Sequence, residues 1–123
     1  MKDLKIMKCS LCGGIVLSIK ECSCENCVTC CGKAMEEVSS VNEEKVSTHK
    51  PSYYRQDNKL IIRVNHEQGT DHYIEAIIIK TDNELLVHRF TNEEEPELIM
   101  GYEQDMEIYS VCTKDGICKT IVE

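Results

Sequence analysis

VNHEQGTDHYIEAIIIK, residues 64–80, places two histidines six positions apart, directly before an unbroken apolar run. The run at 72–80 and the preceding KLIIRV at 59–64 are rich in Ile and Val, which predicts two strands. A glycine between them permits a turn, so we expect neighbouring antiparallel strands. His66 and His72 would then flank the connection at one end of a sheet.

Three further β-rich runs follow, separated by the polar turn signals TDN and KDG. No segment shows a sustained helical period. Short strands at close spacing predict an all-β fold with an antiparallel sandwich over residues 39–123. The polar stretch SSVNEEKVSTHKPSYY, residues 39–54, is interpreted as a linker entering this domain. The three runs are ELLVHRF (84–90), MEIYSV (106–111) and CKTIV (118–122).

Other potential metal ligands occur at the ends of these predicted elements. Cys112 follows a predicted strand, Asp115 lies three residues further on, and His49 precedes the sandwich. With His66 and His72 they make a mixed nitrogen and sulfur set that suits iron, zinc or copper. The alternative is that the histidines are ordinary surface residues at strand ends.

Seven of the nine cysteines fall in the first 31 residues, where few large apolar side chains exist to form a core. The N-terminus lacks the apolar run of a signal peptide, so we expect a cytoplasmic protein with reduced thiols. Clustered cysteines then predict a small metal-binding domain at 1–38, with glycines supplying open backbone angles. The alternative is that the cysteines form disulfides or are unpaired buried thiols. The seven are Cys9, Cys12, Cys22, Cys24, Cys27, Cys30 and Cys31.

The spacing alone leaves the ligands of this first site open. Cys9 and Cys12 with Cys24 and Cys27 would make a zinc ribbon, whereas Cys24, Cys27 and Cys30 repeat as in cluster-binding runs. Tetrahedral sulfur ligation suits zinc and iron alike.

Charge and hydropathy exclude some partners. Residues 1–40 are neutral, while residues 41–123 hold nine Lys or Arg against 17 acidic residues and carry the whole net charge of −8. Because an acidic surface repels phosphate backbones, we expect no nucleic-acid partner. No apolar stretch approaches the roughly 20 residues of a membrane span.

The motifs together resemble the desulfoferrodoxin and superoxide reductase family. VNHEQGTDHYIEAI is similar to its histidine motif, THKP (48–51) to the histidine at the domain entrance, and CTKDG (112–116) to the closing motif with the axial thiolate. CSLCGG (9–14) and CCGKAM (30–35) are similar to a desulforedoxin-like module. These matches follow one another in family order over almost the whole chain.

The resemblance implies a desulforedoxin/rubredoxin-like domain followed by an immunoglobulin-like sandwich. An FeS4 centre would use Cys9, Cys12, Cys30 and Cys31, and a second iron would cycle between Fe2+ and Fe3+ on His49, His66, His72 and Cys112. The implied activity is superoxide reductase, which detoxifies superoxide to hydrogen peroxide with electrons from a rubredoxin-like donor. The family commonly forms homodimers.

Two positions depart from the family pattern. The usual fourth histidine is Asp115, and the usual lysine before the entrance histidine is Thr48. A bound carboxylate lowers the formal charge of a ferrous site from +1 to 0, which weakens attraction for an anion. The alternative is that Asp115 stays off the metal, which leaves three histidines, Cys112 and an extra site accessible to water. Lys50 and Lys114 are candidates to replace the missing charge.

Three function classes therefore stay open: the enzyme, an electron-transfer or metal-binding protein of the same fold with an altered site, and a zinc-ribbon interaction protein. Three other predictions complete the set. The ligand set that the resemblance implies leaves Cys22, Cys24 and Cys27 as spare thiols, with three roles open: ligands of a second metal, redox-active thiols, or simply exposed thiols. Cys118 is expected to pack in a strand, and His88 to be structural or exposed.

Overall fold

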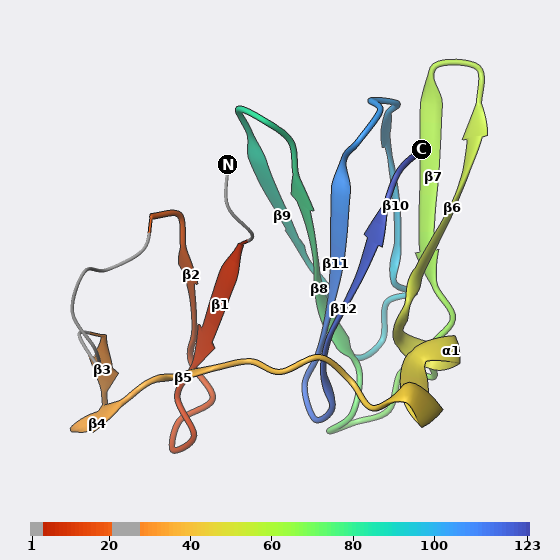
Figure 1. The fold of residues 1–123 in the computed structure, drawn as a ribbon. Coiled ribbons are helices and arrows are strands. Elements are labelled where there is room, and N and C mark those ends of the chain that lie inside the picture. The colour runs from red at the N-terminus through yellow and green to blue at the C-terminus, as the bar shows by residue number, and fades with distance from the viewer. Residues whose placement is uncertain (1–3, 21–27) are drawn as a thin grey trace. The chain divides into compact units, whose positions relative to one another are not determined.

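A computed structural model describes residues 4–20 and 28–123, and the chain divides into two compact units, Met1–Ser39 and Ser40–Glu123. In the first unit, strand β1 (Lys5–Lys8) pairs antiparallel with β2 (Ile15–Ser18) and with β5 (Glu36–Glu37) (Figure 1). A second, minimal pair joins β3 (Thr29–Cys30) and β4 (Lys33–Ala34). The strands are short because the segment has few apolar residues to bury.

The second unit is a sandwich of two antiparallel sheets. One sheet has the order β10-β7-β6 and the other β12-β11-β8-β9. This arrangement of three and four strands in Greek-key order is immunoglobulin-like and confirms the predicted fold class. The strands are β6 (Pro51–Gln56), β7 (Lys59–Val64), β8 (Ile74–Lys80), β9 (Leu85–Arg89), β10 (Glu97–Gly101), β11 (Glu107–Cys112) and β12 (Gly116–Ile121).

The core lies between these sheets and uses the inward residues of both. Leu60 and Ile62 of β7 meet Ile77, Ile79 and Ile108 of the other sheet, and all five are at most 1% exposed. Each fully buried aliphatic side chain contributes roughly 1.5–3 kcal/mol through the hydrophobic effect. This rigid core fixes the strand ends from which the loops emerge.

The expected pairing of the strands around the two histidines is wrong. β7 pairs with β6 and β10, whereas β8 pairs with β11 and β9, so residues 65–73 cross from one sheet to the other. Because both strands bury an apolar face, they pack face to face across the core instead of side by side.

The interpretation of residues 39–54 as a linker is also wrong. The stretch contains a 3₁₀ turn η1 (Glu43–Lys45), a single helical turn α1 (Val46–His49) and the start of β6. Pro51 fits the first position of β6 because this strand lies at a sheet edge. Within the described ranges, no helix is both long and apolar enough to cross a membrane.

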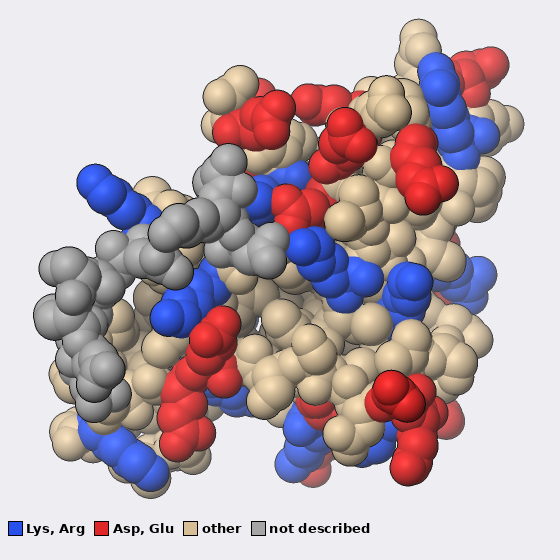
Figure 2. Space-filling view, viewed as in Figure 1, with Lys and Arg blue, Asp and Glu red and all other residues tan. Residues whose placement is uncertain are grey.

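Charges of both signs lie on the face of the second unit that Figure 2 draws. Figure 2 shows lysines and arginines beside acidic side chains, with acidic groups gathered where the β8–β9 and β10–β11 turns lie. On the four-stranded sheet, Glu107 accepts hydrogen bonds from Lys80 at 2.6 Å, Lys119 at 2.8 Å and Tyr109 at 2.9 Å. Burial alone would raise the pKa of Glu107, but these hydrogen bonds outweigh it and lower the pKa to about 2.

We predict that Glu107→Gln lowers the free energy of unfolding at pH 7 by on the order of 3 kcal/mol, because Lys80 is 4% exposed and loses its charged partner. The folded-state pKa lies below the ordinary 4.5, so the stabilisation is present above about pH 4.5 and is lost as pH falls toward 2. Denaturant unfolding from pH 7 to pH 2 checks this.

The control is Glu95→Gln, which breaks an exposed pair with Arg63 and should lower the free energy of unfolding by less than about 1 kcal/mol. A wild-type advantage that stays constant across the pH range would contradict the prediction.

Candidate metal centres

His49 is the last residue of α1. Hydrogen bonds hold both its backbone carbonyl and its side chain. Ser110 of β11 donates a hydrogen bond to its carbonyl oxygen at 2.5 Å. The imidazole Nδ1 lies 2.7 Å from the carbonyl oxygen of Lys45, four residues earlier. Because a carbonyl only accepts, Nδ1 carries the proton, and Nε2 of the neutral ring keeps a lone pair for a metal.

His66 and His72 lie in the crossing segment 65–73, whose shape is set by backbone hydrogen bonds. The N–H of Gly69 donates to the carbonyl oxygen of His72 at 2.8 Å. The side chain of Gln68 accepts from the N–H of Ile74 at 2.9 Å and donates to its carbonyl at 3.3 Å. The Gln68 side chain thus makes the hydrogen bonds that a neighbouring strand would make with the backbone of Ile74 at the start of β8. These bonds hold the loop that lies between the two histidines.

Gln68→Ala is expected to loosen this loop. The free energy of unfolding should fall by about 1–3 kcal/mol because the start of β8 loses side-chain hydrogen bonds. Metal affinity should fall roughly tenfold or more, as is typical when residues that hold metal ligands are lost. Chemical unfolding and metal titration check both effects. Gln56→Ala, at the exposed end of β6, is the control. Equal metal affinity in wild type and Gln68→Ala would contradict the prediction.

Cys112 and Asp115 come from the β11–β12 hairpin. The pairing of β11 with β8 shifts register between Val111 and Cys112, a bulge of the kind that re-aims side chains beside functional sites. The N–H of Thr113 donates to the carbonyl of Tyr73 at 3.0 Å, which ties the hairpin to the histidine segment.

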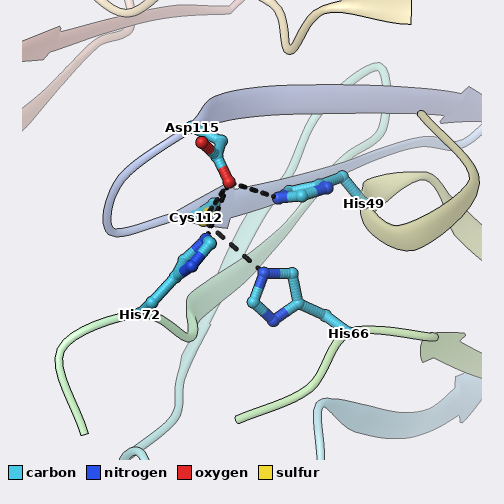
Figure 3. Close-up of side chains that lie close together, drawn as sticks. All are labelled: His49, His66, His72, Cys112 and Asp115. Atoms are coloured by element: carbon cyan, nitrogen blue, oxygen red, sulfur yellow. Dashed lines mark hydrogen bonds and ion pairs between the residues drawn. The ribbon is translucent and has the colours of Figure 1, made fainter. Parts of the chain in front are cut away.

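These elements bring five predicted ligands together at one end of the sandwich (Figure 3). Asp115 Oδ2 lies 2.7 Å from His72 Nε2 and 3.1 Å from His49 Nε2. Cys112 Sγ lies 3.8 Å from both His66 Nε2 and Asp115 Oδ2. One ligand atom from each residue lies within 4.8 Å of all the others: His49, His66, His72, Cys112 and Asp115.

The set fits a single metal ion in size and chemistry. Metal bonds of about 2.0–2.3 Å place the donor atoms of one ion roughly 3–4.5 Å apart, close to the separations found here. His49 Nε2 lies 3.1 Å from Asp115 Oδ2, and a metal ion bound here would accept a lone pair from each of these two atoms. Three imidazoles, a thiolate and a carboxylate suit a transition metal.

The charge states also suit metal binding. Burial, and then the nearby His49 and His72, lowers the pKa of His66, so its imidazole is neutral at pH 7. Burial raises the pKa of the Cys112 thiol, so a metal that binds the thiolate must displace a proton. The Nδ1 of His66 is buried and has no hydrogen-bond partner among the described residues.

Lys45 is a component that the sequence reasoning missed. Its Nζ lies 2.7 Å from Asp115 Oδ1, and this contact, with a smaller contribution from His72, lowers the pKa of Asp115 to about 2. An open pocket of about 400 Å³ is lined by Lys45, Thr48, His49, His66, Glu67, Gly69, His72 and Asp115. Lys50 and Lys114, the cations considered from the sequence, do not line it.

The second cluster lies in the first unit. Cys9, Cys12, Cys30 and Cys31 bring their sulfur atoms within 4.8 Å of one another. Cys12 and Cys30 are 3.6 Å apart and Cys30 and Cys31 3.9 Å, whereas a disulfide would require about 2.05 Å. A tetrahedral site with metal–sulfur bonds of about 2.3 Å has edges of about 3.8 Å. The four cysteines are therefore spaced for one tetrahedral metal.

The surroundings of these cysteines favour a thiolate at Cys9 but a protonated thiol at Cys30. Gly13 and Gly32 adopt φ values of 77° and 73°, the open angles predicted for tight knuckles. Peptide N–H groups of Cys12 and Leu11 lower the pKa of Cys9 to about 7, while the neighbouring thiols of Cys12 and Cys9 raise that of Cys30 to about 12. A bound cation would offset this crowding of sulfur charges.

Cys118 and His88 are not members of either cluster. Cys118 is half-buried in β12, as expected for a strand-packing residue, and His88 is exposed on β9 beside Phe90. Cys22, Cys24 and Cys27 lie outside the described residues, so their proposed roles are untested.

Comparison with known proteins shows which proteins share this fold. No protein-family model matches the chain, and a sequence comparison with curated proteins finds no match. The fold is that of superoxide reductases. Superoxide reductase from Treponema pallidum aligns over 96% of this chain and 97% of its own with a TM-score of 0.75 and 18% identity. Superoxide reductase from Nanoarchaeum equitans aligns over 61% of this chain and 91% of its own with a TM-score of 0.48 and 20% identity. The predicted resemblance is confirmed at the level of the fold, and the four-cysteine cluster followed by a His/Cys site is consistent with a desulfoferrodoxin-type architecture.

Proposed function

We propose that the protein is an iron-dependent superoxide reductase, which reduces superoxide to hydrogen peroxide with electrons from a rubredoxin-like donor. The observation that carries this proposal is the convergence of His49, His66, His72 and Cys112 at one end of a superoxide reductase fold. Ferrous iron held there would supply one electron to superoxide, which with two protons gives hydrogen peroxide.

The residues of the chain have distinct parts in this reaction. The three imidazoles are neutral donors that leave the metal its positive charge. The Cys112 thiolate donates electron density, the role that thiolates have at other iron sites. The pocket admits a small anion from solvent, and Lys45 places a positive charge in its wall. Together these features attract an anionic, diatomic substrate to a reducing metal.

We propose iron for the four-cysteine site as well, as an FeS4 centre on Cys9, Cys12, Cys30 and Cys31. The sulfur spacing supports tetrahedral ligation, and one-electron exchange at such a centre suits a protein that receives electrons from a small redox donor. We further propose a cytoplasmic location, where thiols stay reduced, and a homodimer.

A second candidate is an electron-transfer protein of the same fold with an altered superoxide site. Asp115 favours it, because its carboxylate lies among the metal donors and reduces the positive charge offered to an anion. Lys45 opposes it by returning one positive charge beside the same carboxylate.

Metal analysis, visible absorption and superoxide consumption separate the possibilities. The enzyme is expected to hold two irons, one with a cysteine-only spectrum and one with a red thiolate-to-iron charge-transfer band, and to consume superoxide without releasing oxygen. Two irons without superoxide consumption would favour the electron-transfer protein. Zinc alone would contradict both.

A further inference from the structure

Lys45 contacts two of the five converging residues through different atoms. Its backbone carbonyl accepts the Nδ1 hydrogen of His49 at 2.7 Å, and its side-chain ammonium lies 2.7 Å from Asp115 Oδ1. These contacts leave His49 Nε2 and Asp115 Oδ2 facing one another at 3.1 Å. One residue thus orients a nitrogen donor and an oxygen donor toward the same point.

The two carboxylate oxygens of Asp115 make different contacts. Oδ1 is bound by Lys45, and Oδ2 lies near His72, His49 and Cys112. A carboxylate held by one oxygen cannot rotate freely, so the other oxygen keeps a single direction. The Asp115 side chain is 12% exposed, so solvent competes little for these contacts.

We propose that Asp115 is a fifth donor to the metal and that Lys45 is the positioning residue that holds it there. This inference rests on the proposed function for the identity of the metal, but it concerns metal retention and not turnover.

Asp115 and Lys45 would also set the charge of the metal centre. Asp115 removes the formal +1 of a ferrous site with three imidazoles and one thiolate, and Lys45 adds one positive charge just outside the donor atoms.

The geometry explains why lysine fits this position. Lys45 ends η1, one residue before α1, so its carbonyl points along the helical turn toward His49 while its side chain reaches the β11–β12 hairpin. Its side chain is 46% exposed, and its substitution is not expected to disturb the core. The backbone contact to His49 survives any substitution, so a side-chain variant tests the Asp115 contact alone.

The test measures iron retention in the full chain loaded anaerobically with Fe2+ and then oxidised. A graded chelator series gives the concentration at which half of the red thiolate-to-iron band is lost. Lys45→Met is expected to lower this concentration about tenfold to hundredfold, and Lys45→Arg to restore it because arginine keeps the charge and the donors. Lys50→Met, which removes a lysine outside the pocket, is the matched control.

A double-mutant cycle separates a positioning role from a general structural one. In the Asp115→Asn background, Lys45→Met is expected to add no further loss, because the contact it removes no longer holds a charged donor. An equal loss in both backgrounds, or no loss in wild type, would overturn the proposal.

Superoxide consumption on the same preparations keeps the two proposals distinct. Iron-loaded wild type that retains iron through Lys45 and Asp115 but consumes no superoxide would refute the proposed function and support the positioning role. Rapid superoxide consumption with iron retention indifferent to Lys45 would refute only the positioning role.

Discussion

Cys112→Ser is expected to abolish the red charge-transfer band and to lower superoxide reduction by more than about 100-fold, beyond the loss typical of residues that merely hold a metal ligand. The physical reason is that a serine hydroxyl does not ionise near neutral pH and does not donate electron density as a thiolate does. Stopped-flow absorbance and superoxide consumption on iron-loaded protein check the two effects.

The matched control is Cys118→Ser. Cys118 is a half-buried cysteine of β12 that is not among the converging ligands, so its loss should leave the band and the rate unchanged. Cys112 is 3% exposed, and its replacement by serine also places a hydroxyl in the core. Unfolding measurements on the metal-free proteins therefore accompany the test. A Cys112→Ser variant that folds and keeps the red band would refute the assignment of this thiolate.

Removal of metal from the four-cysteine site is expected to unfold the first unit. Its buried apolar side chains in the described residues are Ile6 and Met35, together with Cys9, which is too few to hold strands of four residues or fewer. Metal binding in small structural sites supplies roughly 10–16 kcal/mol and commonly carries the folding free energy. Hydrogen exchange of the β1 and β2 amides, with and without a strong chelator, checks this expectation.

The second unit supplies an internal control for the same experiment, because it has a separate core around Leu60, Ile77 and Ile108. Its β8 and β11 amides should stay protected when the metal is removed. Cys9→Ser should mimic chelation, whereas Cys24→Ser should not if Cys24 is a spare thiol. Protected β1 and β2 amides in the metal-free protein would contradict the prediction.

The sequence predicted which potential ligands lie together better than it predicted the structure around them. His66, His72 and Cys112 stand beside strongly apolar strands, and each strand ends where its loop begins, so the ligands could be placed at one end of a sandwich. The bulge that accompanies Cys112 depends on a register shift against β8, which no local pattern reveals.

The errors arose where pairing is nonlocal. Gly69 suggested a hairpin turn, but its N–H is used within the loop, and β7 and β8 belong to different sheets. In the second unit two strands were missed: β6 begins with Pro51 in a polar stretch, and β10 begins at Glu97, the last residue of the acidic run NEEEPE.

Lys45 was missed for a related reason. A single helical turn produces no periodic pattern, and the partner of Lys45 lies 70 residues away on the β11–β12 hairpin. Lys45 lies three residues before Thr48, and only the folded chain brings its side chain to the pocket beside Asp115.

The central claim is that His49, His66, His72 and Cys112 bind one iron. An anomalous difference map at the iron absorption edge, from crystals of the iron-loaded protein, tests it most directly. We predict a peak about 2.0–2.3 Å from a nitrogen of each histidine and from the Cys112 sulfur, with Asp115 Oδ2 at a similar distance. A well-ordered end of the sandwich without such a peak, or a peak bound by other residues, would contradict the account.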